Sequence, residues 1–391
     1  MSISVKVKKG MAASSWATMM FKRINAGEVC DLTLGNPAIE PPPAFTEGLK
    51  HTANNPFPGM HRYTPLAGYP ETQEAVAKTL SMESGLSVSA QHVVMTAGAT
   101  AALNIILKAI LNPGEEVIVL APHFVEYPYY IDNHGGVCCT AETNPDFTVN
   151  IDKIAAKINL RTRAIIINSP NNPTGRVYSG KSLKAVAELL EKKSRELGRD
   201  IYLISDEAYR YVVFDGIKTP DLFKIYPNTI VAASYSKQLS IPGERAGYAA
   251  VHPEIKDADE LIEALTYANR VLGYLCAPAL MQQVITHLQG VCVDMAEYKE
   301  RRDRLCDALE DFGYSFICPK GAYYLFPESP GDDLVFAQEL SKEGVLVNPG
   351  RMFGRSGYFR IAFCGKKETI EKSLKSFRKV KDFSNRNPKG I

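Results

Sequence analysis

The sequence lacks an excess of charge of either sign. Its 391 residues include 45 Lys and Arg against 43 Asp and Glu, which gives a formal net charge of +2 at pH 7. A surface that binds nucleic acid or an anionic membrane needs a strong positive excess. We therefore expect neither nucleic acid nor a membrane among the partners of this chain.

Long hydrophobic runs are also missing. No stretch approaches the ~20 consecutive apolar residues of a membrane-spanning helix, and the N-terminal MSISVKVKKGMAASSWATMMF has no sustained apolar core of a secretory signal. The composition, 45% hydrophobic and 23% charged, is that of a soluble globular protein. The length predicts two or three domains, or one large core with a smaller one. For the only tryptophan, Trp16, we expect packing in the core or in a lid.

The histidines and cysteines lack the spacing of metal ligands. The seven histidines are scattered, and neither His-x-x-x-His nor Cys-x-x-Cys occurs, so we expect no metal site. The eight cysteines are irregularly spaced and several lie in apolar runs, which is typical of reduced thiols in a cytoplasmic protein. The adjacent Cys138 and Cys139 leave a redox-active pair open as an alternative.

What the sequence does contain is an alternation of strand-like and helix-like segments. Short apolar runs occupy 92–96, 115–120, 164–168, 201–205, 229–234 and 246–251, and helical patterns follow the first three, at 99–111, 125–134 and 181–197. Continuous apolar strands between helices predict an α/β fold, with a mostly parallel central sheet and helices on both faces. Open sheets of this kind bind ligands where their strands end.

The pattern changes after about residue 290. A charged helix is expected at 295–311, followed by short apolar segments and a second helix near 333–343. This succession predicts a smaller α+β unit, to which the N-terminal segment with its proline run is also expected to belong. We therefore predict a large domain at 46–290 and a small domain made of 1–45 and 291–391.

One lysine, Lys237, stands among hydroxyls in the segment SYSKQLSIPGERAGY at 234–248. A free lysine has a pKa of ~10.4 and is a poor nucleophile at neutral pH. Enzymes use lysine covalently by lowering that pKa, or by holding it as a Schiff base to an aldehyde cofactor. One lysine alone is ordinarily interpreted as a solvated surface residue. Here the neighbouring residues favour the covalent role instead.

The neighbours of Lys237 suit a phosphate group. Three side chains close to it in sequence offer the hydroxyl and guanidinium donors that phosphates bind, namely Ser234, Ser236 and Arg245. A second such element lies between a predicted strand and the helix after it, and consists of Gly98, Ala99 and Thr100. Backbone N–H groups at a helix N-terminus bind anions, although a glycine here is also compatible with a simple tight turn. Two such elements and a lysine indicate a phosphorylated aldehyde, pyridoxal 5'-phosphate.

That cofactor makes further demands. Its ring nitrogen needs a carboxylate if the ring is to act as an electron sink. Asp206 fits at a strand end, and alternation along the strand puts its rival Glu207 on the opposite side. Donors for the ring oxygen are available from Tyr209 and from an Asn of NSPNNPTG at 168–175. Phe124, just past another strand, offers an apolar face for the ring.

Four segments in their order resemble the fold-type I, class I/II pyridoxal-phosphate aminotransferases, above all the aspartate aminotransferase-like enzymes. They are NSPNNPTG, SDEAY, SYSKQLSIPGERAGY and GYFRIAF, and with LGNP at 34–37 the resemblance spans nearly the whole chain. It implies the fold-type I transferase fold, pyridoxal phosphate as cofactor, and an amino acid and a 2-oxo acid as substrates.

The resemblance also implies roles for single residues. Lys237 would bond to the cofactor aldehyde and then move the substrate proton, and Asp206 would pair with the ring nitrogen. Asn172 and Tyr209 would bond the ring oxygen, and Phe124 stands at the stacking position, where relatives often have Trp or Tyr. The phosphate would be held by Ala99, Thr100, Ser234 and Arg245.

For the substrate, the resemblance implies that Arg360 grips the α-carboxylate as a bidentate pair, with Gly35 and Asn172 beside it. Tyr63 resembles the tyrosine that reaches the phosphate of the neighbouring subunit, which implies a homodimer. Packing is the alternative for Tyr63 and for Phe124, and a structural ion pair is the alternative for Arg360.

The function implied is transfer of an amino group from an L-amino acid to a 2-oxo acid such as 2-oxoglutarate, by a ping-pong mechanism. Aspartate is the default donor by resemblance only, since no Lys or Arg is assignable to a second substrate carboxylate. The tyrosines in GAYYLFP keep aromatic donors open. A β-lyase or related carbanion chemistry is the alternative. A non-catalytic sensor fused to a DNA-binding module is not expected, because the enzyme-like motifs begin close to the first residue and the net charge is small.

Overall fold

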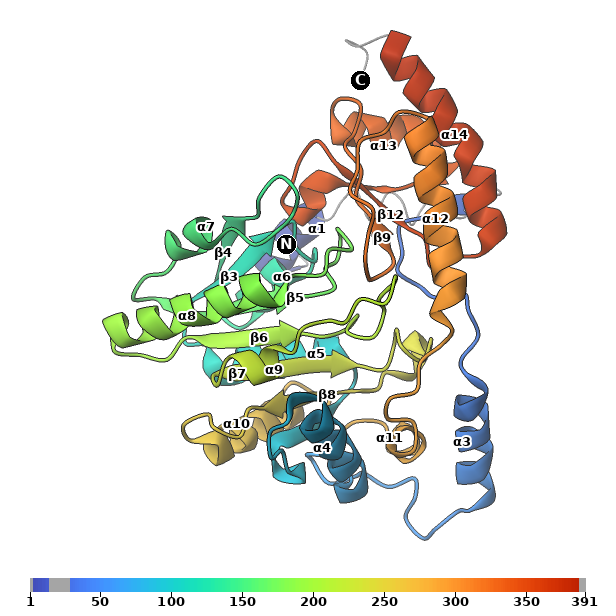
Figure 1. The fold of residues 1–391 in the computed structure, drawn as a ribbon. Helices are drawn as coiled ribbons and strands as arrows, with labels where there is room; N and C mark the ends of the chain where they lie inside the picture. The colour runs from blue at the N-terminus through green and yellow to red at the C-terminus, as the bar shows by residue number, and fades with distance from the viewer. Residues whose placement is uncertain (1–2, 14–28, 387–391) are drawn as a thin grey trace.

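The computed structural model describes residues 3–13 and 29–386, so the expectation for Trp16 falls outside the described residues. Figure 1 shows a large α/β body, with a second group of helices and short strands placed against it. Within the described ranges, none of the helices combines the length and the apolar character that crossing a membrane requires.

A seven-stranded sheet forms the centre of the large body. Its strand order is β2-β8-β7-β6-β5-β3-β4, and the pairings among β7, β6, β5, β3 and β4 are all parallel. The strands are β2 Val93–Thr96, β3 Glu116–Ala121, β4 Val137–Glu142, β5 Thr162–Asn168, β6 Tyr202–Asp206, β7 Thr229–Ser234 and β8 Gly247–Val251. The predicted mostly parallel sheet is therefore confirmed.

Strand β8 runs opposite to the other strands of this sheet, because it pairs antiparallel with both β2 and β7. The chain from β7 to β8 contains no α-helix, only the short 3₁₀ turn Pro242–Glu244. A parallel return needs a crossover of a dozen or more residues, whereas a short connection reverses the strand. This connection carries Lys237, which the fold thus fixes beside the end of β7.

Helices cover both faces of the sheet, as predicted. Ala164 and Ile166 of β5 pack in one core cluster with Leu103 of α5, while the alternate residue Ile165 packs with Leu183 of α8 in another. Alternation along a buried strand requires this division. The helices of this body are α3 Pro43–Asn54, α4 Pro70–Ser84, α5 Ala99–Ile110, α6 Tyr127–Asn133, α7 Ile151–Ala155, α8 Gly180–Leu197, α9 Leu222–Ile225, α10 Ala258–Val271 and α11 Ala279–Thr286.

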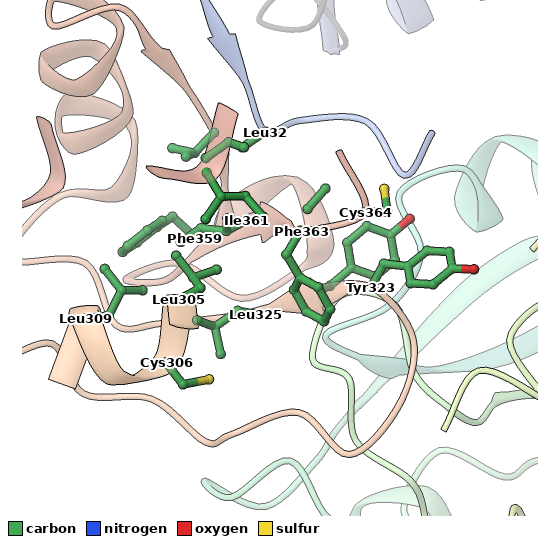
Figure 2. Close-up of a cluster of buried hydrophobic side chains, with 14 of the residues drawn as sticks. Leu32, Leu305, Cys306, Leu309, Tyr323, Leu325, Phe359, Ile361, Phe363 and Cys364 are labelled. Carbon is green, nitrogen blue, oxygen red and sulfur yellow. The ribbon is translucent and has the colours of Figure 1, made fainter. Parts of the chain in front are cut away.

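The second group has its own apolar core. Leu305 and Leu309 of α12 pack there with Leu325, Phe359 and Ile361 of the small strands (Figure 2). Its helices are α12 Met295–Asp311, α13 Asp333–Lys342 and α14 Lys367–Arg386, and its strands are β9 Tyr324–Leu325, β10 Val345–Leu346, β11 Asn348–Pro349 and β12 Phe359–Ala362. Strands β11, β12 and β9 form an antiparallel sheet.

The N-terminal segment contacts both bodies. Strand β1, Cys30–Asp31, pairs in parallel with β10 of the small group, and Phe45 of α3 packs with Val284 of α11 in the large one. Helix α1, Val5–Ala13, lies near α6 (Figure 1), where Lys6 binds Asp132 at 2.9 Å. The domain division at 46–290 stays a prediction.

Candidate active site

A cavity of about 1020 Å³ opens where the strands of the central sheet end. Its floor carries residues at or just after the ends of β2, β3, β5, β6 and β7, and its opposite wall comes from β9, β11 and β12. Of the residues that the sequence singles out, the lining includes Gly35, Ala99, Thr100, Phe124, Asn172, Asp206, Tyr209, Ser234, Ser236, Lys237, Arg245 and Arg360.

Lys237 projects into this cavity from the β7–β8 connection. Its Nζ donates a hydrogen bond to the carbonyl of Gly35 at 2.5 Å, and its own carbonyl accepts from the Tyr323 hydroxyl at 2.8 Å. Burial lowers the pKa of Lys237, and the positive charges of Arg245 and Arg360 lower it further, whereas Cys364 opposes them. A lysine with a lowered pKa is a better nucleophile and base at neutral pH.

Asp206 lies at the end of β6 and faces the cavity. Its carboxylate accepts hydrogen bonds from the Tyr127 hydroxyl at 2.5 Å and from the Ala208 N–H at 3.2 Å. Burial raises its pKa, so a cationic group beside it would restore the charged form. Glu207 turns to the other side, where it accepts from Ser205 and pairs with Arg210 at 3.2 Å. Of these two carboxylates, Asp206 lines the cavity and Glu207 does not.

A cradle of donors stands at the start of α5. Ser234 donates to the Ser236 hydroxyl at 2.8 Å, and Arg245 reaches Ser236 at 3.4 Å and the Ala97 carbonyl at 3.1 Å. Among the described residues, no carboxylate pairs with Arg245. Gly98 has a φ of +85°, and a Cβ there would stand 2.8 Å from the Arg245 guanidinium. The backbone conformation of Gly98 therefore favours glycine, and an added side chain would displace the guanidinium from the cradle, which fits an anion.

Arg360 reaches the cavity from β12 on the opposite wall. It donates to the Asn172 amide oxygen at 2.9 Å and to the Thr33 carbonyl, and it lies over the Tyr324 ring at 4.4 Å. Its Nε is buried without a partner, and no carboxylate of the described chain pairs with it. Burial lowers the pKa of Arg360. A buried guanidinium with only neutral partners is suited to an anionic ligand.

Tyr209 and Phe124 complete the walls near Asp206. The Tyr209 hydroxyl lies 2.7 Å from the Tyr324 hydroxyl, and both rings are buried. Phe124 meets Tyr127 edge to face, with ring centroids 5.5 Å apart. An aromatic side chain held in this way presents an apolar surface to the cavity.

Tyr63 is not brought to this cavity. It is 83% exposed, and it is absent from the cavity lining of the single chain. A large aromatic side chain with that exposure is available for contact with a second copy of the chain.

The sequence did not single out two contacts of the site. Tyr127 lies three residues after Phe124, and no local pattern shows that its hydroxyl meets Asp206. Tyr324 belongs to GAYYLFP, whose tyrosines kept aromatic donors open, and its contact with Tyr209 was not predicted. A Cβ at Gly35 would collide with the Tyr324 hydroxyl, so glycine is needed where the chain passes this ring.

The remaining cavity wall is largely apolar. Leu34, Val125 and Met352 line it, together with Arg351 and Glu126. Arg351 binds both Asp333, at 2.7 Å, and Asp332, at 2.5 Å, so its charge is already balanced. Burial raises the pKa of Glu126. Besides Arg360 and the two cations of the floor, Lys237 and Arg245, no unpaired cation faces the cavity from the described residues.

Known proteins share both the sequence pattern and this architecture. The family described as aminotransferase class I and II matches residues 27–377. The chain belongs to this family. An aspartate/prephenate aminotransferase of Thermus thermophilus is 33% identical over 359 residues, covering 89% of this chain and 90% of that one. An aspartate aminotransferase of Thermotoga maritima is 30% identical over 389 residues, covering 97% of each. The crystal structure of an aminotransferase from Eubacterium rectale superposes with a TM-score of 0.90 at 37% identity, covering 98% and 97%.

The protein is therefore an aminotransferase that depends on pyridoxal phosphate, and it has the fold of the type I enzymes. The cavity fits that cofactor on its own geometry. It brings together an anion cradle without a carboxylate, a lysine with a lowered pKa, and a buried carboxyl that lacks a cation. These three features match the phosphate, the aldehyde and the ring nitrogen of pyridoxal phosphate.

Proposed function

We propose that the enzyme moves the amino group of an L-amino acid to a 2-oxo acid such as 2-oxoglutarate, in two stages that share one site. The observation that carries this proposal is the position of Arg360. Its buried guanidinium lines the same cavity as Lys237 and has only neutral partners. An α-carboxylate is common to both substrates, and a bidentate contact with Arg360 would hold either of them in turn.

The cofactor would be held by residues of the floor. Its phosphate would lie in the cradle of Ala99, Thr100, Ser234, Ser236 and Arg245, next to Gly98, and its ring between Phe124 and the opposite wall. Asp206 would meet the ring nitrogen, and Asn172 and Tyr209 the ring oxygen. When bound, pyridoxal phosphate supplies an electron sink for the charge that remains after the Cα proton leaves.

Lys237 has the position and the pKa for the proton transfer. Its Nζ is held at the Gly35 carbonyl, close to Arg360 in the lining of one cavity. With a lowered pKa, Nζ accepts a proton from the substrate Cα at neutral pH more readily than an ordinary lysine. The first oxo acid leaves before the second enters, so the course is ping-pong.

Aspartate is the default donor, because relatives of this chain carry that name. A specific observation favours a second candidate, a neutral or aromatic donor. The cavity wall near Leu34, Val125 and Met352 is apolar, and Arg351 is already paired with two aspartates. A dicarboxylate would meet no unpaired cation among the described residues there.

A half-reaction tests the proposal. Enzyme loaded with pyridoxal phosphate is mixed singly with L-aspartate, L-phenylalanine, L-alanine or L-cystathionine, and the oxo acid formed is measured beside the absorption of the bound cofactor. We expect one equivalent of oxo acid per site and then arrest, until 2-oxoglutarate restarts turnover. Continuous release of oxo acid and ammonia without an acceptor would overturn the proposal and indicate a β-lyase.

We further propose that the enzyme works in the cytoplasm as a homodimer. None of the eight cysteines, which all lie in the described ranges, forms a disulfide, and this suits a reducing compartment. Exposed Tyr63 is the residue proposed to reach the phosphate of the neighbouring subunit. The segment 46–290 would form the cofactor domain, and 1–45 with 291–391 the small domain.

A further inference from the structure

Two cysteines that lie apart in the sequence meet at the edge of the small core. Cys306 belongs to α12 and lies at the margin of the apolar cluster in Figure 2. Cys318 lies in the irregular segment between α12 and β9. The Cys306 thiol donates to the Cys318 sulfur, and the two Sγ atoms are 3.7 Å apart.

Contacts made by neighbouring residues hold the two segments that carry these cysteines together. Arg302, one turn before Cys306 on α12, donates to the Pro319 carbonyl at 3.2 Å, directly after Cys318. Arg302 and Lys320 also share Asp215, at 2.8 and 3.0 Å. The approach of the sulfurs therefore follows from contacts on both sides of Cys318, and does not depend on the thiols themselves.

We propose that Cys306 and Cys318 are a modification site, a dithiol that forms a reversible intrachain disulfide by exchange with a low-molecular-weight disulfide such as oxidised glutathione. A disulfide bond is about 2.05 Å long, so the sulfurs must approach by about 1.7 Å. Cys318 stands on a segment without regular structure, where rotation of its side chain closes such a gap without breaking a helix.

The exchange has a defined order. The Cys318 thiolate attacks one sulfur of the small disulfide and releases its other half as a thiolate. Cys306 then gives up its proton and attacks the Cys318 sulfur, which releases the second half. The small disulfide takes two electrons and both thiol protons and becomes two thiols, while the protein gains one S–S bond.

Cys318 is suited to the first attack. It is half-buried, whereas Cys306 is buried. The hydrogen bond from Cys306, aided by the charges of Arg302 and Lys320, lowers the pKa of the Cys318 thiol below its ordinary value, although burial opposes them. Thiolate is the reactive form, so exchange begins at the more accessible sulfur of the pair.

Cys138 and Cys139, which are adjacent in sequence, are not suited to such an exchange. Cys138 and Cys139 are successive residues of β4 and pack against different core clusters, one on each face of the sheet. Burial raises the pKa of Cys138 to about 12 and that of Cys139 to about 11. These two thiols neither face one another nor ionise readily.

The new bond would tie α12 to the wall of the active site. The N–H groups of Lys320 and Gly321, just after Cys318, both donate to the Gly175 carbonyl at 3.0 Å. Gly175 closes the loop that carries Asn172, which in turn contacts Arg360. Oxidation would thus fasten a helix of the small core to a segment that supports the substrate site.

Thiol counting with peptide mapping tests the site. The full chain is incubated in glutathione buffers of rising oxidised fraction, quenched in acid, denatured and alkylated, and its mass is measured. We expect two of the eight thiols to be lost together, one cross-linked peptide pair containing Cys306 and Cys318, and full recovery after reduction with dithiothreitol. The wild-type map depends on no variant, so it is decisive even if a variant fails to fold.

Variants then assign the order. Cys306→Ser should accumulate one glutathione adduct at Cys318, Cys318→Ser should keep all its remaining thiols, and Cys139→Ser, the control, should behave as the wild type. Retention of all eight thiols by the wild type, a cross-link between other cysteines, or loss of thiols from Cys318→Ser at the wild-type rate would overturn the proposal.

Discussion

Two buried arginines of this enzyme differ in whether their charge is balanced. Arg302 is 3% exposed and donates to both carboxylate oxygens of Asp215, at 2.8 and 3.0 Å. Arg360 is 6% exposed and donates only to the neutral oxygens of Asn172 and Thr33. A buried charge without a counter-ion costs free energy that an anionic ligand recovers on binding. We therefore propose that Arg302 stabilises the fold and that Arg360 binds the substrate carboxylate.

Replacing each arginine by methionine should show which of the two binds the substrate and which stabilises the fold. Arg360→Met is expected to lower kcat/KM for L-amino acids by about 100-fold or more, because a buried charge pair with the α-carboxylate is lost. Its free energy of unfolding should change by less than about 1 kcal/mol, since a lost hydrogen bond and a relieved buried charge offset each other. Steady-state kinetics and urea unfolding of the enzyme without substrate measure the two effects.

The control is Arg302→Met. It should keep kcat/KM but lose about 2 kcal/mol of stability, less than for a fully buried pair, because Asp215 is partly exposed and keeps Lys320. If Arg360→Met were destabilised as strongly as Arg302→Met, Arg360 would be a structural residue, and its assignment to the substrate would be wrong.

At the scale of elements, the sequence predicted strands that are buried throughout and helices with a regular pattern of buried and exposed residues. The run 229–234 and the helix 295–311 agree with the bounds of β7 and α12. Strand β4, Val137–Glu142, was not predicted, because it stands at the sheet edge and its residues range from exposed to buried. A run of apolar residues marks only strands that are buried on both faces.

The candidate site likewise contains residues that the sequence predicted and contacts that it did not predict. Asp206, Lys237 and Arg360, which all line the cavity, were predicted because each stands in a motif that can be recognised along the chain. The bond from Tyr127 to Asp206 and the pairing of Arg351 with Asp333 join residues of separate elements. Such contacts depend on how elements pack, and no local spacing encodes them.

The start of α5 gives a prediction at this scale. Gly98→Ala should weaken binding of pyridoxal phosphate at least tenfold, because the added Cβ would lie 2.8 Å from the Arg245 guanidinium that completes the cradle. Gly85→Ala is the control, since Gly85 has a φ of +76° and nothing within 4 Å of its Cβ. The backbone cost is about 1 kcal/mol for the left-handed Gly85 and up to about 3 kcal/mol for Gly98, whose ψ of 174° lies in a region that is essentially restricted to glycine. Cofactor titration followed by absorbance measures the difference, and equal affinities in the two variants would contradict it.

The contact between α12 and the segment after β6 gives a prediction on pH. Hydrogen bonds from Arg302 and Lys320 hold the pKa of Asp215 well below its ordinary value. Since the folded pKa lies below the unfolded value of ~3.9, this stabilisation is fully present above about pH 4 and is lost progressively as the pH falls towards the folded pKa. Asp215→Asn should therefore lower the free energy of unfolding at about pH 7 and have a smaller, though not abolished, effect at about pH 3. Urea unfolding at both pH values tests this, and an equal loss at both would exclude it.

At the scale of the whole molecule, the site exists only where two cores meet. Lys237 and Asp206 come from the central sheet, whereas Arg360 and Tyr324 come from the small strands and Gly35 from the N-terminal segment. The hydrogen bond from Lys237 to the Gly35 carbonyl joins these parts. If cofactor and substrate bind as proposed, they contact different bodies of the chain, and binding of both would favour the arrangement in which these bodies are in contact.

Tyr63 is the residue proposed to contact a second copy of the chain. If its exposed ring completes the phosphate site of a partner subunit, Tyr63→Ala and Lys237→Ala damage the same site from different subunits. Each variant alone should be nearly inactive at limiting cofactor. In a hybrid dimer, one site carries both defects and the other carries neither, so random mixing of the two should restore about a quarter of the wild-type sites.

The measurement is transaminase activity at limiting cofactor, after the two variants are unfolded together, refolded and compared with the same variants refolded apart. We expect activity only in the mixture, with dimers seen by light scattering in all samples. Tyr63→Phe serves as the control for the hydroxyl, since it keeps the ring but removes the donor proposed for the phosphate. A mixture no more active than the sum of its parts would place Tyr63 outside the neighbouring site, and the cofactor would then be held by one chain alone.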